Sequence, residues 1–515
     1  MYFLLAIFAV ASVSAIRGLV RHARYRKLSR AFGCQNPLLY PHLDPLFGLD
    51  TFIGSFVATV KSQHVSVFAS RFDKCGSIFA MRSPSGTKLF TIDDENLAAM
   101  YGTPPSIALA MARQSDSAWP HWGVEPARLT AMEPFCGKGF ITTDGDAWQT
   151  SRTALKPCFA RKNIADPGWY QRLVHDFLET LPVGEAFDLA PLLDDLFLEN
   201  SFKFLFGHPL SQLSLEFKTT VPTKGFLGAF HAAETGAGIR VMLGNNRWLF
   251  PTKKYMANCD MVHRFVDEII DHELGTHESA GSKPPNSEDP ITPNSLVHHL
   301  LSQTNDKIEI RGHILQAMMP TSDTTAVLIG NTFFLLSRYP HIWKEFVREV
   351  NSLSQEALSF NELRSLKSVY NILSESIRLY PVLPNLGRTA LQDTILPRGG
   401  GKDGSSPVFV PKGTSCTNSF YALHRNETVF GPGASDFVPA RWNSISPGTF
   451  EYMPFGGGPR QCLGKEKALV EAAYFLIAMA RRFPTIGSRD TREWAGKAKL
   501  SARNARGCLI ALYDS

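Results

Sequence analysis

Helical periodicity of apolar residues dominates the middle of the chain. The segment YMANCDMVHRFVDEIIDHEL, residues 255–274, places apolar side chains every three or four positions, which predicts an amphipathic helix. Two further helices are predicted from about Arg311 to Ser337 and from about Leu363 to Tyr380, and a last one begins near Gly464. The middle and the end of the chain are therefore predicted to be mostly helical.

The pattern changes after the third of these helices. Short β-like runs such as VFVPKG appear there, with glycine-rich turns at 399–401, and they predict small strands. The segment 276–295 is polar and rich in Pro and Ser, which predicts a surface loop without chemistry. No internal repeat or long linker divides the chain. The predicted fold class is mainly α with a minor β part, in a single large domain.

The N-terminal segment is apolar and is followed at once by basic residues. Tyr2 to Ile16 carries no charge, and an extension to Val20, with Arg17 reaching the interface, approaches the roughly 20 residues of a membrane span. The alternative is a cleaved signal peptide, because Val13–Ala15 is similar to a cleavage site. A signal peptide carries its positive charge before the apolar run, whereas here the charge follows it. An anchor is therefore favoured.

These features set the expected organisation of the chain. We expect a transmembrane anchor at 1–20, a basic and Pro-rich linker at 21–45, and the main domain at 46–515. The basic flank is expected to stay in the cytosol, which leaves the N-terminus lumenal.

Charge and cysteine usage narrow the class of protein further. The net charge of +6, from 53 basic and 47 acidic residues, arises in the first 30 positions, so the body has no charge bias towards nucleic acid. The eight cysteines form no CxxC pair and no spacing typical of a disulfide framework. A reducing, cytosol-facing compartment is expected.

The segment PFGGGPRQCLG, residues 454–464, carries the strongest chemical signal. Cys462 follows several glycines and precedes a predicted helix, whose backbone amides are expected to donate to the sulfur and to lower the pKa of the thiol. The glycines allow a flat macrocycle to approach, with Phe455 packed beneath it and Arg460 paired with an anionic propionate. The alternative is a buried structural cysteine in a glycine-rich turn.

This segment resembles the cytochrome P450 signature Phe-x-x-Gly-x-Arg-x-Cys-x-Gly. Phe455, Gly458, Arg460, Cys462 and Gly464 occupy its five fixed positions. The resemblance implies the cytochrome P450 fold, one large haem-binding domain behind the anchor, and haem b with Cys462 as the sulfur ligand to iron. The FGCQNPLLYPHLDPLFGLD segment is similar, more narrowly, to fungal microsomal alkane and fatty-acid hydroxylases.

Two further motifs extend the resemblance. Glu375 and Arg378 stand three apart on a predicted helix, a spacing that alone is typical of a solvated surface pair. In the family, a Glu-x-x-Arg pair and an Arg from a Pro-x-Arg segment form a buried network behind the cysteine loop. Pro439 and Arg441 match that segment, although Ala440 replaces the usual acidic residue. The resemblance implies that Glu375, Arg378 and Arg441 are structural.

A Trp-x-x-x-Arg pair follows the family pattern earlier in the chain. Trp148 and Arg152 are four apart on a predicted helix, and the resemblance implies that they hold haem propionates, as does Arg388. The alternative is an aromatic ring that packs under the aliphatic stem of an arginine.

The oxygen-activating segment departs from the family pattern. Ala-Gly-x-Asp-Thr-Thr becomes Pro320-Thr321-Ser-Asp323-Thr324-Thr. The resemblance implies that Asp323 and Thr324 are catalytic, with Thr324 steadying dioxygen and Asp323 relaying protons. The alternative is local bonding of both side chains to the backbone. Pro320 lacks an N–H group, so we expect it to kink this helix, and Thr321 adds bulk where Gly is usual.

The implied activity is a monooxygenase reaction on a hydrophobic small molecule. One oxygen atom enters a C–H or C=C bond and the other leaves as water, with electrons from an NADPH-dependent cytochrome P450 reductase. Thr321, Val382, Leu383 and Leu386 are expected to line the substrate pocket. The enzyme is expected in the endoplasmic reticulum membrane, with a cytosolic catalytic domain.

Several substrate and function classes stay open at this point. A tailoring step in fungal specialised metabolism is preferred, and an alkane or fatty-acid hydroxylase is the alternative. A haem-dependent isomerase or dehydratase would need no NADPH, and a haem-binding sensor or electron carrier would form no product. The Asp-Thr pair disfavours both.

Overall fold

The computed structural model describes residues 23, 26–27, 29–83, 86–102, 121–159, 167–216, 219–279, 295–353, 362–363, 366–498 and 501–514. The expected anchor at 1–20 lies outside these residues, as does 280–294 of the expected loop. Within the described ranges, no helix combines the length and the apolar character that a membrane crossing requires.

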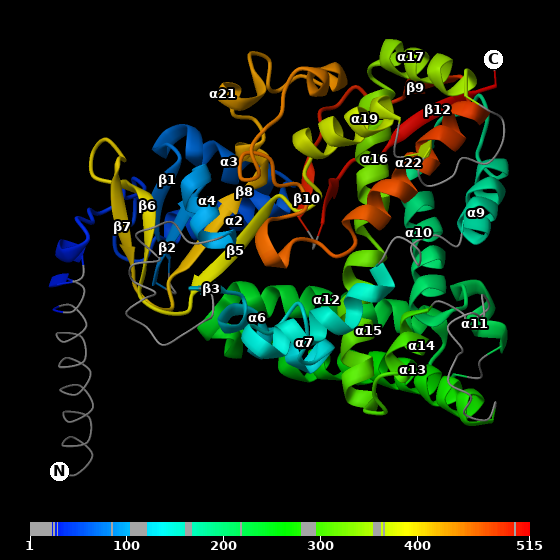
Figure 1. Ribbon diagram of the computed structural model, residues 1–515, viewed down its shortest axis with the longest axis horizontal. Helices are drawn as coiled ribbons and strands as arrows, with labels where there is room; N and C mark the ends of the chain where they lie inside the picture. The colour runs from blue at the N-terminus through cyan, green and yellow to red at the C-terminus, as the bar shows by residue number, and fades with distance from the viewer. Residues whose placement is uncertain are drawn as a thin grey trace.

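Helices make up most of the described chain (Figure 1). The α-helices are α2 (Leu49–Val60), α3 (His64–Cys75), α4 (Asp94–Tyr101), α6 (Glu125–Cys136), α7 (Gly145–Leu155), α9 (Pro167–Glu179), α10 (Leu189–Phe206), α11 (Leu210–Glu216), α12 (Thr223–Leu243), α13 (Thr252–Ser279), α14 (Leu296–Leu301), α15 (Lys307–Thr321), α16 (Thr324–Leu336), α17 (Pro340–Asn351), α19 (Lys367–Leu379), α20 (Phe420–Leu423), α21 (Glu427–Phe430) and α22 (Lys465–Arg482). The 3-10 helices are η1 (Lys156–Phe159), η2 (Gly244–Leu249), η3 (Pro439–Asn443) and η4 (Gly458–Arg460).

Strands form a smaller part, which gathers mainly on one side of the molecule (Figure 1). They are β1 (Ile78–Ser83), β2 (Gly86–Thr91), β3 (Trp122–Gly123), β4 (Phe187–Asp188), β5 (Asn385–Ala390), β6 (Thr394–Gly400), β7 (Ser406–Val410), β8 (Ser415–Ser419), β9 (Thr485–Ser488), β10 (Gly496–Ala498), β11 (Ala502–Asn504) and β12 (Leu509–Tyr513). The largest sheet has the order β1-β2-β8-β5-β3, and β2 and β8 are its parallel pair. The prediction of a mainly α fold with a minor β part is confirmed.

An aromatic core fixes the two helices that reach the site. Phe333 of α16 contacts Trp343 of α17 and Phe475 of α22, with ring centroids 5.6 and 6.0 Å apart. All three side chains are buried, and each such burial contributes about 1.5–3 kcal/mol. The core therefore holds α16 and α22 in place, and Thr324 begins the first of these helices while the cysteine loop precedes the second.

The helix expected from Arg311 to Ser337 is two helices. α15 contains Pro320 in its last turn, and α16 begins after Asp323, whose φ of −127° and ψ of −42° leave the helical region. The expected kink is present, and the prediction of one continuous helix is wrong. Proline removes a backbone donor and clashes with the preceding turn, so the helix ends just after it.

Side-chain hydroxyls reinforce this break. Three of them donate to carbonyls four residues earlier, an arrangement that bends helices. The pairs are Thr321 to Ala317 at 2.9 Å, Ser322 to Met318 at 3.0 Å, and Thr324 to Pro320 at 2.7 Å.

The remaining helical predictions differ from the structure only at their ends. The helix expected over 255–274 is part of α13, which continues to Ser279, so the first positions of the loop expected at 276–295 are helical. α19 and α22 match the helices expected near Leu363–Tyr380 and after Gly464. All eight cysteines are free, as the absence of a disulfide pattern predicted.

Candidate haem site

Cys462 lies in a short loop between η4 and α22. Its backbone N–H donates to the carbonyl of Phe455 at 3.0 Å, which closes the loop. Gly458 has a φ of +65°, and a Cβ atom there would lie 1.5 Å from the carbonyl oxygen of Tyr101. Only glycine fits this position, so the sequence of the loop is dictated by the close approach of α4.

Cys462 is exposed, yet the surrounding protein desolvates its thiol. This burial raises the pKa of the thiol above the ordinary value. The amides of Gly464 and Lys465 and the charge of Arg152 lower the pKa without cancelling the effect of burial. The expected net lowering of the pKa is therefore wrong, because desolvation outweighs the amides at the helix N-terminus.

Arginines surround the loop on the side of α7. Arg152 donates to the carbonyl of Gln461 at 2.8 Å, and Arg460 pairs with Asp144 at 2.6 Å. Both guanidinium groups contact the ring of Trp148, at 5.8 and 4.6 Å from its centroid. The structure thus brings Trp148 and Arg152 together with Arg460, which is distant in sequence.

Two more arginines add positive charge to this group. Burial, then the charge of Arg388, lowers the pKa of Arg128 to about 10. Burial lowers the pKa of Arg460 to about 10 as well; Asp144 opposes this shift, while Arg388, Arg128 and Arg152 add to it. Among the described residues, neither Arg128 nor Arg388 forms an ion pair with a carboxylate. We call Arg128, Arg152, Arg388 and Arg460 the arginine cluster.

The second arginine group, around Glu375, has its guanidinium donors accepted by one carboxylate and by backbone carbonyls of the protein. Arg378 pairs with both oxygens of Glu375 at 2.8 Å, and Arg441 pairs with one of them at 2.9 Å. Trp442 donates to the same carboxylate at 3.0 Å, and Glu375 and Arg378 are fully buried. The three residues expected to form a network are in contact.

Asp323 and Thr324 are neighbours with different partners. The Thr324 hydroxyl donates to Pro320, whereas the Asp323 carboxylate bonds to Ser501 and Arg503 of the β10–β11 hairpin. Local backbone bonding, the alternative reading of the sequence, therefore applies to Thr324 but not to the side chain of Asp323.

The expected pocket residues form a half-buried run. Val382, Leu383 and Leu386 are partly exposed between the buried side chains of Pro381 and Arg388. Thr321 is also partly exposed, next to the helix break. Ala502 of the same β10–β11 hairpin donates its N–H to the carbonyl of Val382 at 2.7 Å, so the hairpin also contacts this segment.

Sequence comparison with known proteins shows which family the chain belongs to. The family described as Cytochrome P450 matches residues 98–495. The chain belongs to the cytochrome P450 family. It is 32% identical over 512 residues to "Cytochrome P450 monooxygenase himC" of Aspergillus japonicus, covering 98% of this chain and 88% of the relative. It is 31% identical over 480 residues to "Cytochrome P450 52A3-A" of Candida maltosa, covering 89% and 87%.

The enzyme class expected from the sequence is thereby confirmed. The chain is a cytochrome P450 monooxygenase, an oxidoreductase that uses haem b and dioxygen, with electrons from a reductase. The residues of the site fit haem. A P450 haem carries two anionic propionates, and the arginine cluster offers four cations against the single carboxylate of Asp144. The exposed sulfur of Cys462 lies beside this cluster.

Sequence reasoning missed two members of this P450 site. Arg128 lies on α6, and no motif marks it. Asp144 pairs with Arg460 and also accepts from the backbone N–H groups of Val124 and Glu125 at 2.8–3.0 Å, so it joins α6 to the cysteine loop.

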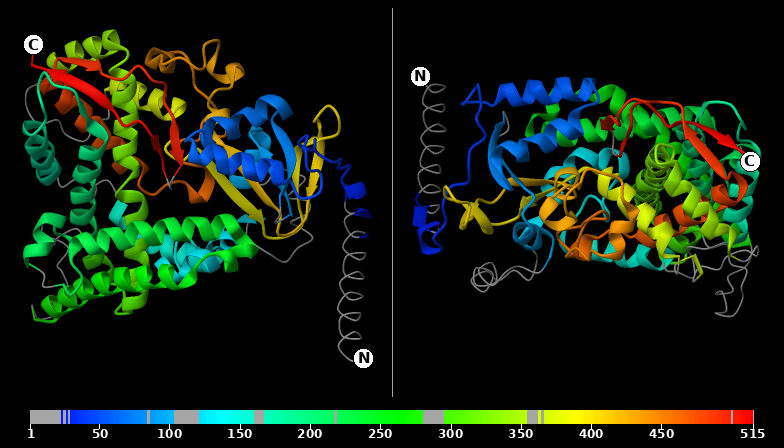
Figure 2. Two further views of the ribbon diagram at one scale, coloured as in Figure 1. Left: turned by 180° about the vertical axis from the view of Figure 1, so that it is seen from behind. Right: turned by 90° about the horizontal axis from the view of Figure 1, so that it is seen from above.

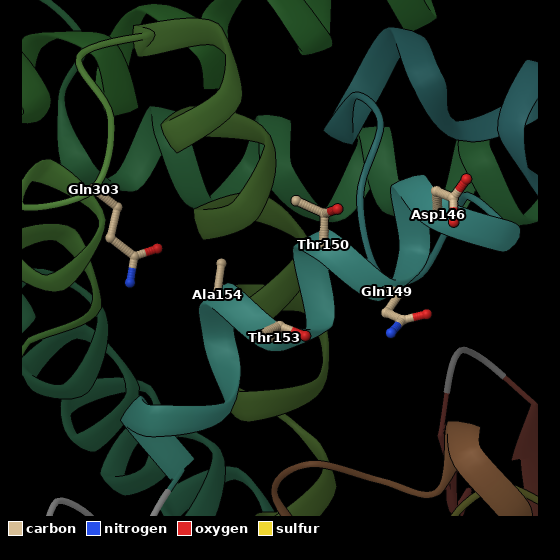
Figure 3. Close-up of a pocket in the computed structure, with 6 residues that line it drawn as sticks. All are labelled: Asp146, Gln149, Thr150, Thr153, Ala154 and Gln303. Carbon is tan, nitrogen blue, oxygen red and sulfur yellow. The ribbon is translucent and has the colours of Figure 1, made fainter.

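A shallow depression on the surface of the P450 is separate from this site (Figure 3). It is lined by Asp146, Gln149, Thr150, Thr153, Ala154 and Gln303. Trp148 and Arg152 lie on the opposite face of α7, as helical spacing requires. The depression therefore contains none of the expected site residues.

Proposed function

We propose that Cys462 is the sulfur ligand of the haem iron and that the enzyme performs a tailoring step in fungal specialised metabolism. The observation that carries the first part is the exposed thiol within a desolvating environment, beside four arginines. Positive charge from Arg152 and the amides before α22 stabilise a thiolate once a metal replaces the proton. Phe455 is partly exposed beside the loop and would contact the macrocycle when haem is bound.

The arginine cluster holds the propionates. Arg152, Arg388 and Arg460 bind them together with Trp148, and Arg128 completes the set. When bound, haem supplies the oxidising chemistry, which places one atom of dioxygen in the substrate and releases the other as water. Glu375, Arg378 and Arg441 act behind the loop, where they fix its position without contact to the reacting atoms.

Asp323 and Thr324 carry out proton transfer. Because the Thr324 hydroxyl donates to the Pro320 carbonyl at 2.7 Å, its oxygen lone pairs are left to accept a hydrogen bond on the side of the break. Asp323 is partly exposed and carries the proton from solvent. Their positions at the N-terminal end of α16 place both beside the opening in the helix.

The substrate is a hydrophobic small molecule that contacts Thr321, Val382, Leu383 and Leu386. Support comes from the run at 382–387, whose residues pack at the edge of the core and are left partly exposed. Relatives described as P450 monooxygenases in Aspergillus and Fusarium support a fungal tailoring reaction, either hydroxylation or epoxidation.

The enzyme works at the endoplasmic reticulum membrane, with a single-pass anchor at 1–20, a linker at 21–45 and the catalytic domain at 46–515 in the cytosol. Support comes from the apolar N-terminus and from exposed apolar side chains on α2, the preceding turn and η2. These include Leu43, Leu46, Phe47, Phe52, Ile53, Phe56, Trp248 and Leu249. In the right-hand view of Figure 2, α2 and the helices that flank η2 lie along the same upper side.

Electrons come from an NADPH-dependent cytochrome P450 reductase in the same membrane.

Deletion of the coding sequence in the producing fungus, with growth under ¹⁸O₂, tests this function. We expect one metabolite to be lost and a precursor to accumulate, and the lost metabolite to carry one ¹⁸O atom per step in the wild type. An unchanged metabolite profile, or a lost product without label from dioxygen, would contradict the proposal.

A further inference from the structure

The carboxylate of Asp323 is bound at both oxygens by one hairpin. Oδ2 accepts from the Ser501 hydroxyl, and Oδ1 pairs with Nη2 of Arg503. Ser501 is fully buried, and Asp323 and Arg503 are 20% and 26% exposed, so solvent reaches the pair only at its edge. No residue near Asp323 in the sequence makes these contacts.

Arg503 joins this carboxylate to a second one. Its Nη1 and Nη2 pair with the two oxygens of Asp194 on α10, the longer contact being 3.2 Å. Burial opposes the charge of the guanidinium, but the bonds to Asp194 and Asp323 outweigh it and raise the pKa of Arg503. Burial raises the pKa of Asp194, and Arg503 lowers it. One guanidinium is thus shared between two carboxylates from two helices.

The hairpin also contacts the proposed pocket. β11 carries Arg503, and the adjacent Ala502 donates its N–H to the carbonyl of Val382. Trp494, just before β10, donates to Asn331 of α16 at 3.0 Å. The hairpin is therefore attached both to the pocket segment and to the helix that Asp323 precedes.

We infer that Arg503 and Ser501 are positioning residues that hold the Asp323 carboxylate for proton transfer, and that Asp194 retains the guanidinium when Asp323 is protonated. This inference rests on the proposed function. An O–H bond forms at Asp323 Oδ2 with a proton from solvent. It breaks as the proton passes by way of the Thr324 hydroxyl into the water that the reaction releases, so the Asp323 carboxylate is regenerated and no electrons are transferred in this step. Protonation leaves Asp323 neutral, and Asp194 then still balances the charge of Arg503, so no buried charge is left alone.

The test compares two routes of oxygen supply in the purified holoenzyme. With microsomal cytochrome P450 reductase and NADPH, oxygen uptake needs protons from the protein. Cumene hydroperoxide already carries a proton on its oxygen, so this second route does not need one from Asp323. The rate of guaiacol oxidation measures the second route. We expect Arg503→Ala to lower NADPH-driven oxygen uptake by at least about tenfold and to leave the hydroperoxide route within about twofold. Arg503→Lys, which keeps the charge, is expected to recover part of the loss.

Arg506→Ala is the matched control, because Arg506 is exposed on the same stretch of chain and donates to the carbonyl of Glu493. It is expected to leave both routes unchanged. Equal losses in both routes, or no loss in either, would overturn the role of Arg503. Absence of a reduced carbon monoxide band in the wild type would instead overturn the proposed function itself.

A second readout does not depend on turnover. In urea unfolding, Arg503→Ala, Asp194→Asn and the double variant form a thermodynamic cycle. We expect Asp194→Asn to cost less stability in the Arg503→Ala background than in the wild type, or none, because the Asp194 contact is already lost there and the substitution removes an unpaired carboxylate. Strictly additive shifts of the midpoint would show that Arg503 and Asp194 do not interact, and would overturn the shared guanidinium.

Discussion

Two groups of arginines, one around Glu375 and one around Asp144, differ in how the surrounding residues compensate their positive charge. Around Glu375, the donors of Arg378 and Arg441 reach one carboxylate and several carbonyls, such as those of His424 and Gly433. In the arginine cluster, four cations face the carboxylate of Asp144, and burial with mutual repulsion lowers the pKa of Arg460 to about 10. The first group is satisfied by the protein itself, whereas the second carries spare positive charge that suits an anionic ligand.

The largest expected effect on stability comes from removing the carboxylate of Glu375 from the first arginine group. Glu375→Gln removes the carboxylate from two buried guanidinium groups, and loss of one partner of a buried ion pair costs about 3–5 kcal/mol. We expect this variant to unfold at a clearly lower urea concentration, whether or not haem is present. Arg398→Ala, which breaks an exposed pair with Glu95, is the control and is expected to leave the midpoint unchanged. An unaffected Glu375→Gln variant would contradict the structural role.

A smaller effect, with a different dependence on haem, is expected in the arginine cluster. Arg128→Met removes one cation that a propionate would pair with, and a charge-assisted hydrogen bond contributes about 1.5–3 kcal/mol. We expect haem to dissociate about tenfold to a hundredfold faster, measured by transfer to apomyoglobin. The haem-free protein is expected to lose no stability, because repulsion with Arg388 is relieved. A haem-free form weakened as much as the holoenzyme would refute the contrast between the two groups.

Local motifs could be predicted from the sequence, and contacts between distant segments could not. The cysteine loop, α13 and the kink after Pro320 follow from residues that are neighbours along the chain. Arg128, Asp144 and Arg503 act on partners from other elements, more than 150 positions away for Arg503 and Asp323. Their spacing follows from packing of the whole fold, which no short pattern encodes.

The direction in which the pKa of the Cys462 thiol is shifted could not be predicted from the sequence, for a related reason. The helix N-terminus that lowers it is local and was predicted, but the burial that raises it comes from the surrounding fold. Only the structure shows that burial outweighs the helix N-terminus, so that the pKa is raised.

The smallest expected effect concerns this thiol in the haem-free protein. Because burial raises the pKa of Cys462 above its ordinary value of 9.0, its alkylation by iodoacetamide is expected to be slow at neutral pH and still increasing at pH 9. Arg152→Ala removes a charge that favours the thiolate, so the alkylation midpoint is expected to move to still higher pH. Mass spectrometry of the modified peptide measures both profiles, and a midpoint below 9 or a downward shift would refute this electrostatic account.

The reduced carbon monoxide difference spectrum tests most directly whether Cys462 ligates haem. Membranes that contain the wild-type protein are predicted to show the red-shifted Soret band of a thiolate-ligated haem. Cys462→Ser is predicted to abolish that band, while Cys416→Ser, at a buried cysteine of β8, retains it. A well-folded wild-type protein that takes up no haem, or a Cys462→Ser variant with an unchanged band, would contradict the account.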